Sequence, residues 1–333
     1  MRLSVFLISF LLLVSCSETE KTLTGYSGNS GEVIVVCSAE TWEGPVGHAL
    51  RNSFNPVIYG LPQDEASFDL IHFRKEKFKS IIESHRNVVY VTIASDEKET
   101  KSEFQKNRFA RGQLFLGLRS MHQDSLATLI KNKGEKLTQR FKDVELNRQY
   151  LRNKKFGDAN IQKQLKEKMR LSISPQKDVY IEKLDSNLAW LRLERERTKG
   201  GYKHQISQGV LLFTKEYKAR ENFSESALIE LANSVLQKAI PGPSEGSYMQ
   251  IAREPVPPLS REVNFKSSYG RETRGLWYME NSFMGGGFIF IASLDEKRDR
   301  IVGAYGYVYA PGFDKREYLR EVEAMIKSLE IEA

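Results

Sequence analysis

Two stretches of the sequence place an aromatic ring beside a carboxylate, a combination that suits the binding of sugars and other polar ligands. The first is Trp42 and Glu43, which open the loop 42–47 between an expected strand and an expected helix. Free backbone N–H groups at a helix N-terminus attract anions, and the tryptophan ring offers a flat surface to a sugar. The alternative, which we favour, is that Pro45 occupies the first helical position and Trp42 packs on the sheet.

The second stretch is the cluster Trp277, Glu280 and Asn281, which lies beside the glycine-rich turn 284–287. Its mixture of aromatic and polar groups suits a ligand groove. Because successive side chains of a strand point to opposite faces, Trp277 and Tyr278 cannot both line one cleft. We therefore favour a place for Trp277 in the core and keep the groove as the alternative.

No catalytic residue can be assigned from these clusters. Glu43 and Glu280 could act as a pair in glycoside hydrolysis only if the fold brings them together, since the separation of the two carboxyl groups decides the reaction. The five histidines show no spacing typical of a zinc site, and the sequence has no nucleophile elbow, phosphate-binding loop or dinucleotide fingerprint. The sequence thus predicts neither a metal nor another cofactor.

The first residues have the pattern of a bacterial lipoprotein signal. Arg2 precedes the short apolar run 3–14, and a small residue stands directly before Cys16. The run is too short to span a bilayer. We therefore expect residues 1–15 to be removed and Cys16 to be acylated, for instance with palmitate, by more than one chain. Residues 16–31, rich in Ser, Thr, Gly and Glu, then form a flexible tether.

This signal predicts a protein of the cell envelope. Ser17 follows the acylated cysteine where an aspartate would favour retention at the inner membrane, so we expect an outer-membrane lipoprotein that faces the periplasm or the cell surface. Nucleic acid is then not an expected partner. The other cysteine, Cys37, ends an apolar run and has no disulfide partner left, so we expect a buried, unreactive thiol.

Positive charge is concentrated in one segment. The chain has 50 Lys and Arg against 43 Asp and Glu, a formal net charge of +7. Residues 131–170 alone hold thirteen basic and five acidic residues, so the rest of the chain is nearly neutral. This segment predicts contact with an acidic envelope protein or with an anionic glycan or lipid surface. The alternative, slightly favoured, is an ordinary solvated helix face.

The spacing of apolar residues predicts an α+β protein with two mixed α/β halves joined by a long helical segment. The N-terminal half, 32–123, alternates strands and helices. The joining segment, 124–171, holds a long amphipathic helix that Gly157 interrupts. The C-terminal half, 176–333, is expected to be mostly antiparallel sheet with packed helices.

Individual strands and helix ends follow from the same patterns. Strands are expected at 32–37, 68–73, 87–94, 113–118, 179–184, 188–194, 209–214, 261–269, 273–280, 287–294 and 300–309. One helix should begin after Ser224 as its N-cap. The last helix should begin at Asp314, with Glu317 completing a capping box.

Several motifs resemble those of a domain-of-unknown-function family of Bacteroidota envelope lipoproteins. They are Gly31 with the following WEGPVG at 42–47, the stretches RGLW at 274–277 and FMGG at 283–286, and the ending VYAPG at 308–312. The resemblance covers about residues 28–330. It implies the envelope location and the extent of the folded part, and it supplies no active-site or binding residue.

A shorter resemblance concerns Asp124, Ser125 and Leu126. They are similar to the O-glycosylation site of exported Bacteroidota proteins, with Ser125 as the modified residue. The alternative, which we favour, is that Asp124 is the N-cap of the long helix.

Together these features predict a lipid-anchored envelope protein that acts as a non-catalytic binding or assembly module. The other hypothesis is a hydrolase or transferase acting on an envelope glycan or peptide. A cleft with two carboxylates roughly 5–10 Å apart would favour the enzyme. A flat apolar patch of more than about 300 Å² would favour the binding module.

Overall fold

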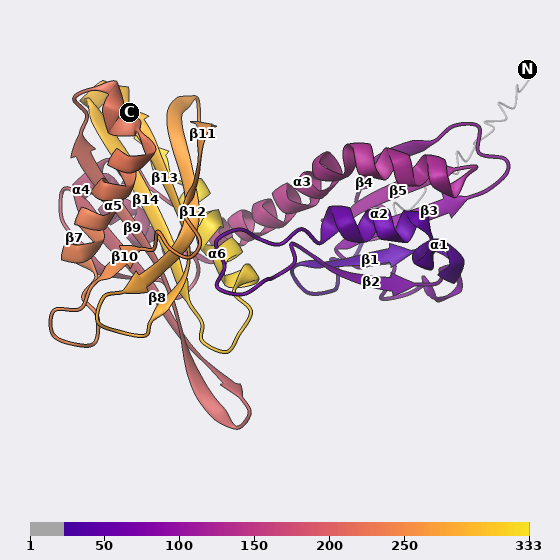
Figure 1. The fold of residues 1–333 in the computed structure, drawn as a ribbon, viewed down its shortest axis with the longest axis horizontal. Coiled ribbons are helices and arrows are strands. Elements are labelled where there is room, and N and C mark those ends of the chain that lie inside the picture. Colours follow the sequence, from indigo (N-terminus) through magenta and orange to yellow (C-terminus); the bar gives the residue numbers. More distant parts are fainter. Residues whose placement is uncertain (1–22, 333) are drawn as a thin grey trace, which may run out of the picture.

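The computed structural model describes residues 23–332 and has an elongated shape built from two mixed halves (Figure 1). The N-terminal half holds a five-stranded sheet and the C-terminal half an eight-stranded one. The long helix α3 (Gln123–Phe156) runs from the first half to the second (Figure 1). The predicted α+β class, with two mixed halves and a long helical segment between them, is confirmed.

The N-terminal sheet is mixed, with the strand order β2-β1-β3-β5-β4. Its first four strands are parallel, and β4 pairs antiparallel with β5 at the edge. The strands are β1 (Glu32–Val36), β2 (Asp69–Phe73), β3 (Asn87–Ile93), β4 (Lys101–Lys106) and β5 (Leu114–Ser120). The runs of Val, Ile and Leu in β1, β3 and β5 form strands because central parallel strands are buried on both faces.

Helices cover one face of this sheet. α1 (Ala39–Glu43) and α2 (Pro45–Phe54) follow β1, and α3 packs beside α2. Apolar side chains of these helices, such as Leu50 and Phe141, close the N-terminal core. A smaller apolar cluster, which includes Phe115, forms on the opposite face of the sheet.

α3 continues beyond the N-terminal sheet and contacts α6 (Arg316–Lys327) of the C-terminal half. With 34 residues it is about 51 Å long at 1.5 Å per residue. It ends next to Gly157, where the sequence predicted a break, and a Cβ on Gly157 would lie 2.2 Å from the carbonyl oxygen of Pro175. The predicted N-cap role of Asp124 is wrong, because the helix begins earlier, at Gln123, with His122 as N-cap.

The C-terminal sheet is antiparallel and curls into a half-barrel (Figure 1). Its strand order is β10-β12-β13-β14-β9-β8-β7, with β11 paired to β12. The strands are β7 (Tyr180–Leu184), β8 (Leu188–Lys199), β9 (Tyr202–Glu216), β10 (Met249–Ile251), β11 (Leu259–Phe265), β12 (Ser268–Met279), β13 (Gly285–Asp295) and β14 (Arg300–Tyr309). Two short strands, β6 (Leu171–Ser172) and β15 (Glu330–Ile331), pair with each other.

Helices cover both faces of the C-terminal sheet. α5 (Glu225–Ala239) packs on one face, against side chains such as Phe213. α4 (Ala159–Met169) and α6 pack on the opposite face, against side chains such as Leu212. Neighbouring residues of one strand thus enter different cores, as the period of two requires. Three short 3₁₀ helices complete the described part of the chain: η1 (Lys75–Lys77), η2 (Arg220–Phe223) and η3 (Glu296–Arg298).

The two predicted helix starts of this half have different outcomes. The N-cap role of Ser224 is confirmed, because its hydroxyl accepts a hydrogen bond from the backbone N–H of Ala227. The capping box at Asp314 and Glu317 is wrong: α6 begins at Arg316 and its own N-cap residue makes no side-chain bond. The N–H groups at this end are taken by Glu65 of the N-terminal half instead.

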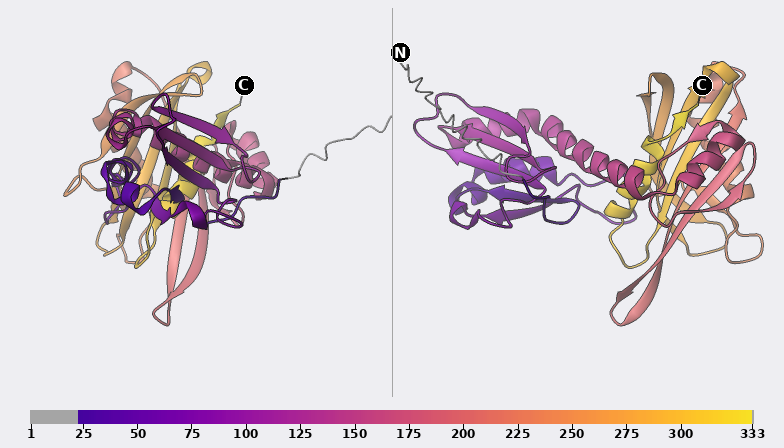
Figure 2. Two further views of the ribbon diagram at one scale, coloured as in Figure 1. Left: turned by 90° about the vertical axis from the view of Figure 1, so that its right-hand side faces the viewer. Right: turned by 180° about the vertical axis from the view of Figure 1, so that it is seen from behind.

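Strands β8 and β9 form a hairpin that projects from the body of the C-terminal half (Figure 2). The sequence predicted only the inner parts of these strands, 188–194 and 209–214. The outermost part, 196–205, consists largely of exposed polar and charged residues, such as Glu196 and Arg197. Apolar alternation therefore stops before the strands do.

The predicted signal peptide and the acylation site Cys16 lie outside the residues that the structure describes. Within residues 23–332, no helix combines the length and the apolar character that crossing a membrane requires.

Candidate functional site

The first predicted cluster lies in the N-terminal half. The expected loop 42–47 is in fact two helices: Trp42 and Glu43 end α1, and Pro45 is the first residue of α2. The Trp42 ring stacks on the His72 ring, with 5.0 Å between centroids and 5° between planes, and Arg51 lies 4.5 Å from its centroid. Two protein side chains therefore hold the indole ring, while the Glu43 side chain is exposed.

The second predicted cluster ends β12. Trp277 is only 2% exposed, and its indole N–H donates a hydrogen bond to the carbonyl of Val308 at 3.2 Å. Tyr278 is exposed, so the predicted alternation of the two rings is confirmed. Glu280 accepts a hydrogen bond from the side-chain amide of Gln250 at 2.6 Å, and Asn281 sits in the following turn with a φ of 55°. Trp277 is thus part of the core.

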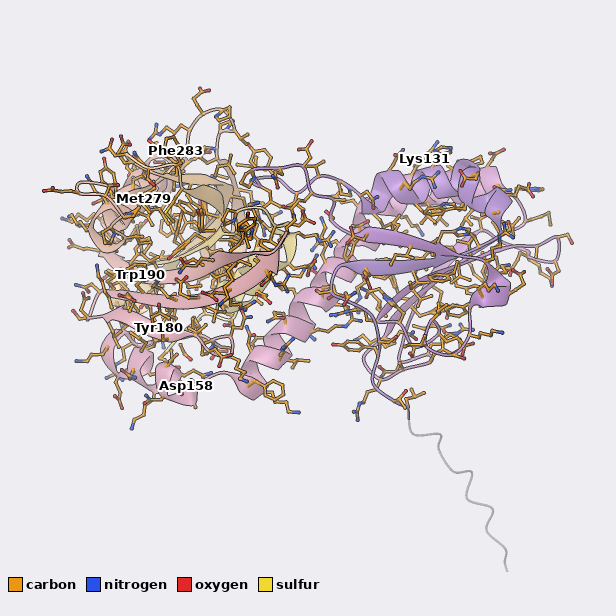
Figure 3. The ribbon with its side chains drawn as sticks, turned by 90° about the horizontal axis from the view of Figure 1, so that it is seen from below. Lys131, Asp158, Tyr180, Trp190, Met279 and Phe283 are labelled. Carbon is orange, nitrogen blue, oxygen red and sulfur yellow. The ribbon has the colours of Figure 1, made fainter. Side chains whose placement is uncertain are left out.

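The two clusters lie in opposite halves of the molecule. α1 is at the outer end of the N-terminal half (Figure 1), whereas Met279, directly before Glu280, lies on the outer side of the C-terminal half (Figure 3). Glu43 and Glu280 therefore do not form a carboxylate pair across one cleft.

A cleft of about 290 Å³ opens where the two halves meet. One wall comes from the segment 56–59 and from α3, and the other from β11, β12 and α6. Charged side chains are concentrated in it. This is the site that we regard as the functional candidate of the described chain. Arg274 and Lys142 lie in the RGLW motif and the basic segment noted in the sequence, but no residue of the cleft was predicted as a site residue.

Arg274 of β12 is the centre of an ion network in this cleft. Its guanidinium donates to Glu272 at 2.9 Å and to Glu323 of α6 at 2.6 Å. Lys327 pairs with Glu323 at 2.7 Å, and Arg261 pairs with Glu272 at 2.8 Å. The network joins the sheet to α6.

The two carboxylates of this network are held in the ionised state. Burial raises the pKa of Glu323, but Arg274 and Lys327 outweigh burial and hold it well below its ordinary value. The pKa of Glu272 is lowered in the same way, by the same two cations against burial. A general acid needs a raised pKa, so this pair is unsuited to proton donation at neutral pH.

Lys142 of α3 faces the cleft from the other wall. Its side chain is partly buried, and burial together with Arg274 and Arg320 lowers its pKa below the ordinary value. Within residues 23–332 it forms no ion pair, unlike the other basic side chains of the cleft. A lysine in this setting favours the arrival of an anion.

The basic segment 131–170 has a different environment. Eleven of its thirteen basic side chains are exposed; the exceptions are Lys142 and Arg148. Of these eleven, only Lys163 and Lys166 form an ion pair with a described residue. Figure 3 shows Lys131 near one end of α3 and Asp158 just beyond the other. The unpaired cations are therefore spread over the exposed surface of α3, α4 and Arg170, the C-cap of α4.

Two further expectations concern modification and metals. Ser125 is exposed in the first turn of α3, where an enzyme could reach its hydroxyl. Within residues 23–332, no group of three or more His, Cys, Asp or Glu side chains is placed to hold a metal ion.

Sequence reasoning missed the cleft because its residues come from distant segments. The one available signal was the spacing in α6, where Arg316 and Arg320, and then Glu323 and Lys327, follow each other by four positions on a helix with an apolar opposite face. Such spacing is equally typical of a solvated helix surface. The cleft forms only because α3 and the segment 56–59 pack against this charged face of α6.

Fold and cleft together define a two-part α+β protein with an ionic cleft between its parts. Comparison with family models assigns each part: residues 158–328 match Domain of unknown function (DUF4837), and residues 27–154 match Domain of unknown function (DUF8532). The first match spans just over half of the chain, so the protein belongs to the DUF4837 family. A comparison with curated proteins found no match. The expected resemblance to domains of unknown function is confirmed at this level.

Proposed function

We propose that the protein is a lipid-anchored module of the cell envelope that binds an anionic envelope component and catalyses no reaction. The observation that carries the proposal is the exposed surface of α3, α4 and the C-cap Arg170, where nine basic side chains form no ion pair with a described residue: Lys131, Lys133, Lys136, Arg140, Arg152, Lys154, Lys155, Lys168 and Arg170. We call this set the basic face.

Charge arranged in this way attracts acidic proteins, anionic glycans and anionic lipid headgroups. The acyl chains proposed on Cys16, in a Bacteroidota outer membrane, would keep the basic face close to such material. The expected tether 16–31 is too long, because residues 24–31 bond to the N-terminal half, for example through the N–H of Arg111 to the carbonyl of Thr24 at 2.7 Å. Residues 16–23 are left as the proposed tether between anchor and fold. The ionised carboxylates of the cleft support a binding role over acid–base catalysis.

The basic face is tested by removing four of its charges. The fourfold variant Lys131→Gln, Lys133→Gln, Lys136→Gln and Arg140→Gln should bind isolated cell-wall material and phosphatidylglycerol vesicles more weakly than the unchanged protein, each held in neutral nanodiscs. Added salt should abolish the difference, because the attraction is screened. The matched control changes four exposed lysines elsewhere that form no ion pair with described residues: Lys177, Lys215, Lys238 and Lys297 to Gln. Equal binding by variant and control would refute the role of the basic face.

The anchor is tested separately. Cys16→Ala should release the protein from membranes into the soluble fraction, since the proposed lipid would be lost. A variant that remains with the membrane would refute the lipid anchor while leaving the basic face open to its own test.

A further inference from the structure

The cleft between the halves is distinct from the basic face. Of the thirteen basic residues in 131–170 only Lys142 lines it, and the other lining side chains come from the segment 56–59 with Ser67, α3, β11, β12 and α6. The cleft and the basic face are therefore separate sites, and a ligand of the cleft does not depend on the function proposed for the basic face.

The charges of the cleft leave one cation unmatched. Six basic side chains line it: Lys142, Arg261, Arg274, Arg316, Arg320 and Lys327. Five carboxylates line it or pair with these cations: Asp69, Asp143, Glu272, Glu317 and Glu323. Five of the six cations form an ion pair within the described residues, and Lys142 is the sixth. Lys142 is therefore the lining cation that no described carboxylate pairs with, and an added anion can pair with it.

The surroundings of Lys142 strengthen its attraction for a bound anion. Its side chain is partly buried, and the attraction between two charges is stronger there than in open water. Arg274 and Arg320 act on it from β12 and α6, and Glu323 and Glu135 oppose them only in part. An arriving carboxylate would offset this mutual repulsion of cations.

Part of the lining of the cleft is apolar and exposed. Val57 and Leu259 are 56% and 55% exposed, and Tyr59 and Leu146 add to the same lining. Exposed apolar side chains beside the partly buried ammonium group of Lys142 match a ligand that has an apolar body and one charged end. The volume of about 290 Å³ accommodates on the order of ten non-hydrogen atoms, taking roughly 30 Å³ for each water-sized unit.

We propose that this cleft binds a small organic monocarboxylate, with the carboxylate on the ammonium group of Lys142 and the apolar body against Val57, Tyr59 and Leu259. The ligand is held by one new ion pair and by apolar contact, and no bond is made or broken. It bridges the two halves, because Lys142 and the segment 56–59 belong to the first half and Leu259 to the second.

Hexanoate is the probe for this site, titrated by calorimetry into the full chain in neutral phosphatidylcholine nanodiscs. The unchanged protein should bind hexanoate more tightly than hexylamine, which has the same apolar body and the opposite charge, and more tightly than inorganic phosphate. Failure to bind hexanoate, equal binding of hexylamine, or tighter binding of phosphate would each overturn the proposal.

Lys142 is tested by three substitutions. Lys142→Met should weaken hexanoate binding at least tenfold, and Lys142→Arg should keep most of the affinity, which excludes a simple folding defect. Lys238→Met changes an exposed lysine of α5, outside both the cleft and the basic face, and should leave hexanoate binding unchanged. Unchanged binding by Lys142→Met would overturn the assignment. Because Lys142 is not part of the basic face, Lys142→Met should bind phosphatidylglycerol vesicles normally, so the two proposals fail separately.

Discussion

The carboxylate of Glu65 accepts a hydrogen bond from the backbone N–H of Arg316 at 2.7 Å, although the two residues are 251 positions apart. The N–H of Lys315 donates to both oxygens of the same carboxylate, at 2.7 and 2.9 Å. Glu65 thus caps α6 from the other half of the molecule. A negative charge is favourable there, because the helix dipole places partial positive charge at its N-terminus.

Loss of this cap should destabilise the protein. Glu65 is buried, so Glu65→Ala leaves backbone N–H groups without an acceptor, and we expect the free energy of unfolding to fall by about 1–3 kcal/mol. Urea denaturation measures the change. Asp64→Ala is the matched control, since Asp64 is exposed and adjacent. Equal denaturation midpoints for the two variants would show that the cap contributes nothing.

At Gly47 the fold leaves no room for a side chain. A Cβ added to it would lie 1.7 Å from the carbonyl oxygen of Trp42, a backbone atom that cannot turn away. Alanine normally stabilises a helix relative to glycine by about 1 kcal/mol, but this clash outweighs that gain. Gly47→Ala should therefore lower the free energy of unfolding by about 2 kcal/mol or more.

Thermal denaturation checks this expectation against Gly25→Ala. A Cβ on Gly25 has no atom within 4 Å, so this control should melt with the unchanged protein. If Gly47→Ala melts at the same temperature as the control, the close approach of α1 and α2 at this point is not rigid.

Features encoded by neighbouring residues could be predicted from the sequence. Ser224 and Ala227 are three positions apart, so both residues that form the cap of α5 lie in one short stretch of sequence. Gly157 marks the end of α3 in the same local way. The expected strands 287–294 and 300–309 correspond to β13 and β14, because the charged residues 295–299 separate two apolar runs.

Features that depend on distant residues could not be predicted from the sequence. β4 has the sequence KSEFQK with Phe104 as its one apolar residue, and it is a strand because β5 offers a free edge. Glu65 lies in a stretch typical of a loop, and its capping role exists only after α6 has packed beside it. The cleft forms only where Lys142 of α3, Arg274 of β12 and Arg320 of α6 come close together. No local sequence pattern predicts this.

Acid should weaken the link between sheet and α6. The pKa of Glu323 is lowered in the folded protein relative to about 4.3 in the unfolded chain, so the unfolded state binds a proton more readily. The stability that this carboxylate contributes is therefore present above about pH 4.3 and is lost as the pH falls below that value.

Glu323→Gln should lose less stability than the unchanged protein between about pH 5 and pH 3, because it has no carboxylate to protonate at this position. Urea midpoints measured across this range give the comparison. Glu230→Gln is the control: Glu230 is exposed on α5 and forms no ion pair with a described residue, so its curve should follow the unchanged protein. Parallel curves for Glu323→Gln and the unchanged protein would contradict the prediction.

Cys37 should be inert in the folded protein. The thiol is 1% exposed, and burial raises its pKa to about 11 against the opposing effect of Lys75 and Arg51. At pH 8 roughly one thiol in a thousand is then ionised, and the thiolate is the reactive form. A maleimide reagent should leave Cys37 unmodified in buffer and label it fully in urea. Rapid labelling in buffer would show that β1 opens readily.

The number of thiols labelled in urea also tests the anchor. Cys16 and Cys37 are the two cysteines of the chain. If acyl chains occupy the sulfur of Cys16, the unfolded protein purified from membranes should take up one maleimide, whereas a protein without the anchor should take up two. Cys37→Ser removes the structural thiol, so membrane-purified protein with this change should take up none. One label on that variant would show a free Cys16 and would contradict the proposed lipid anchor.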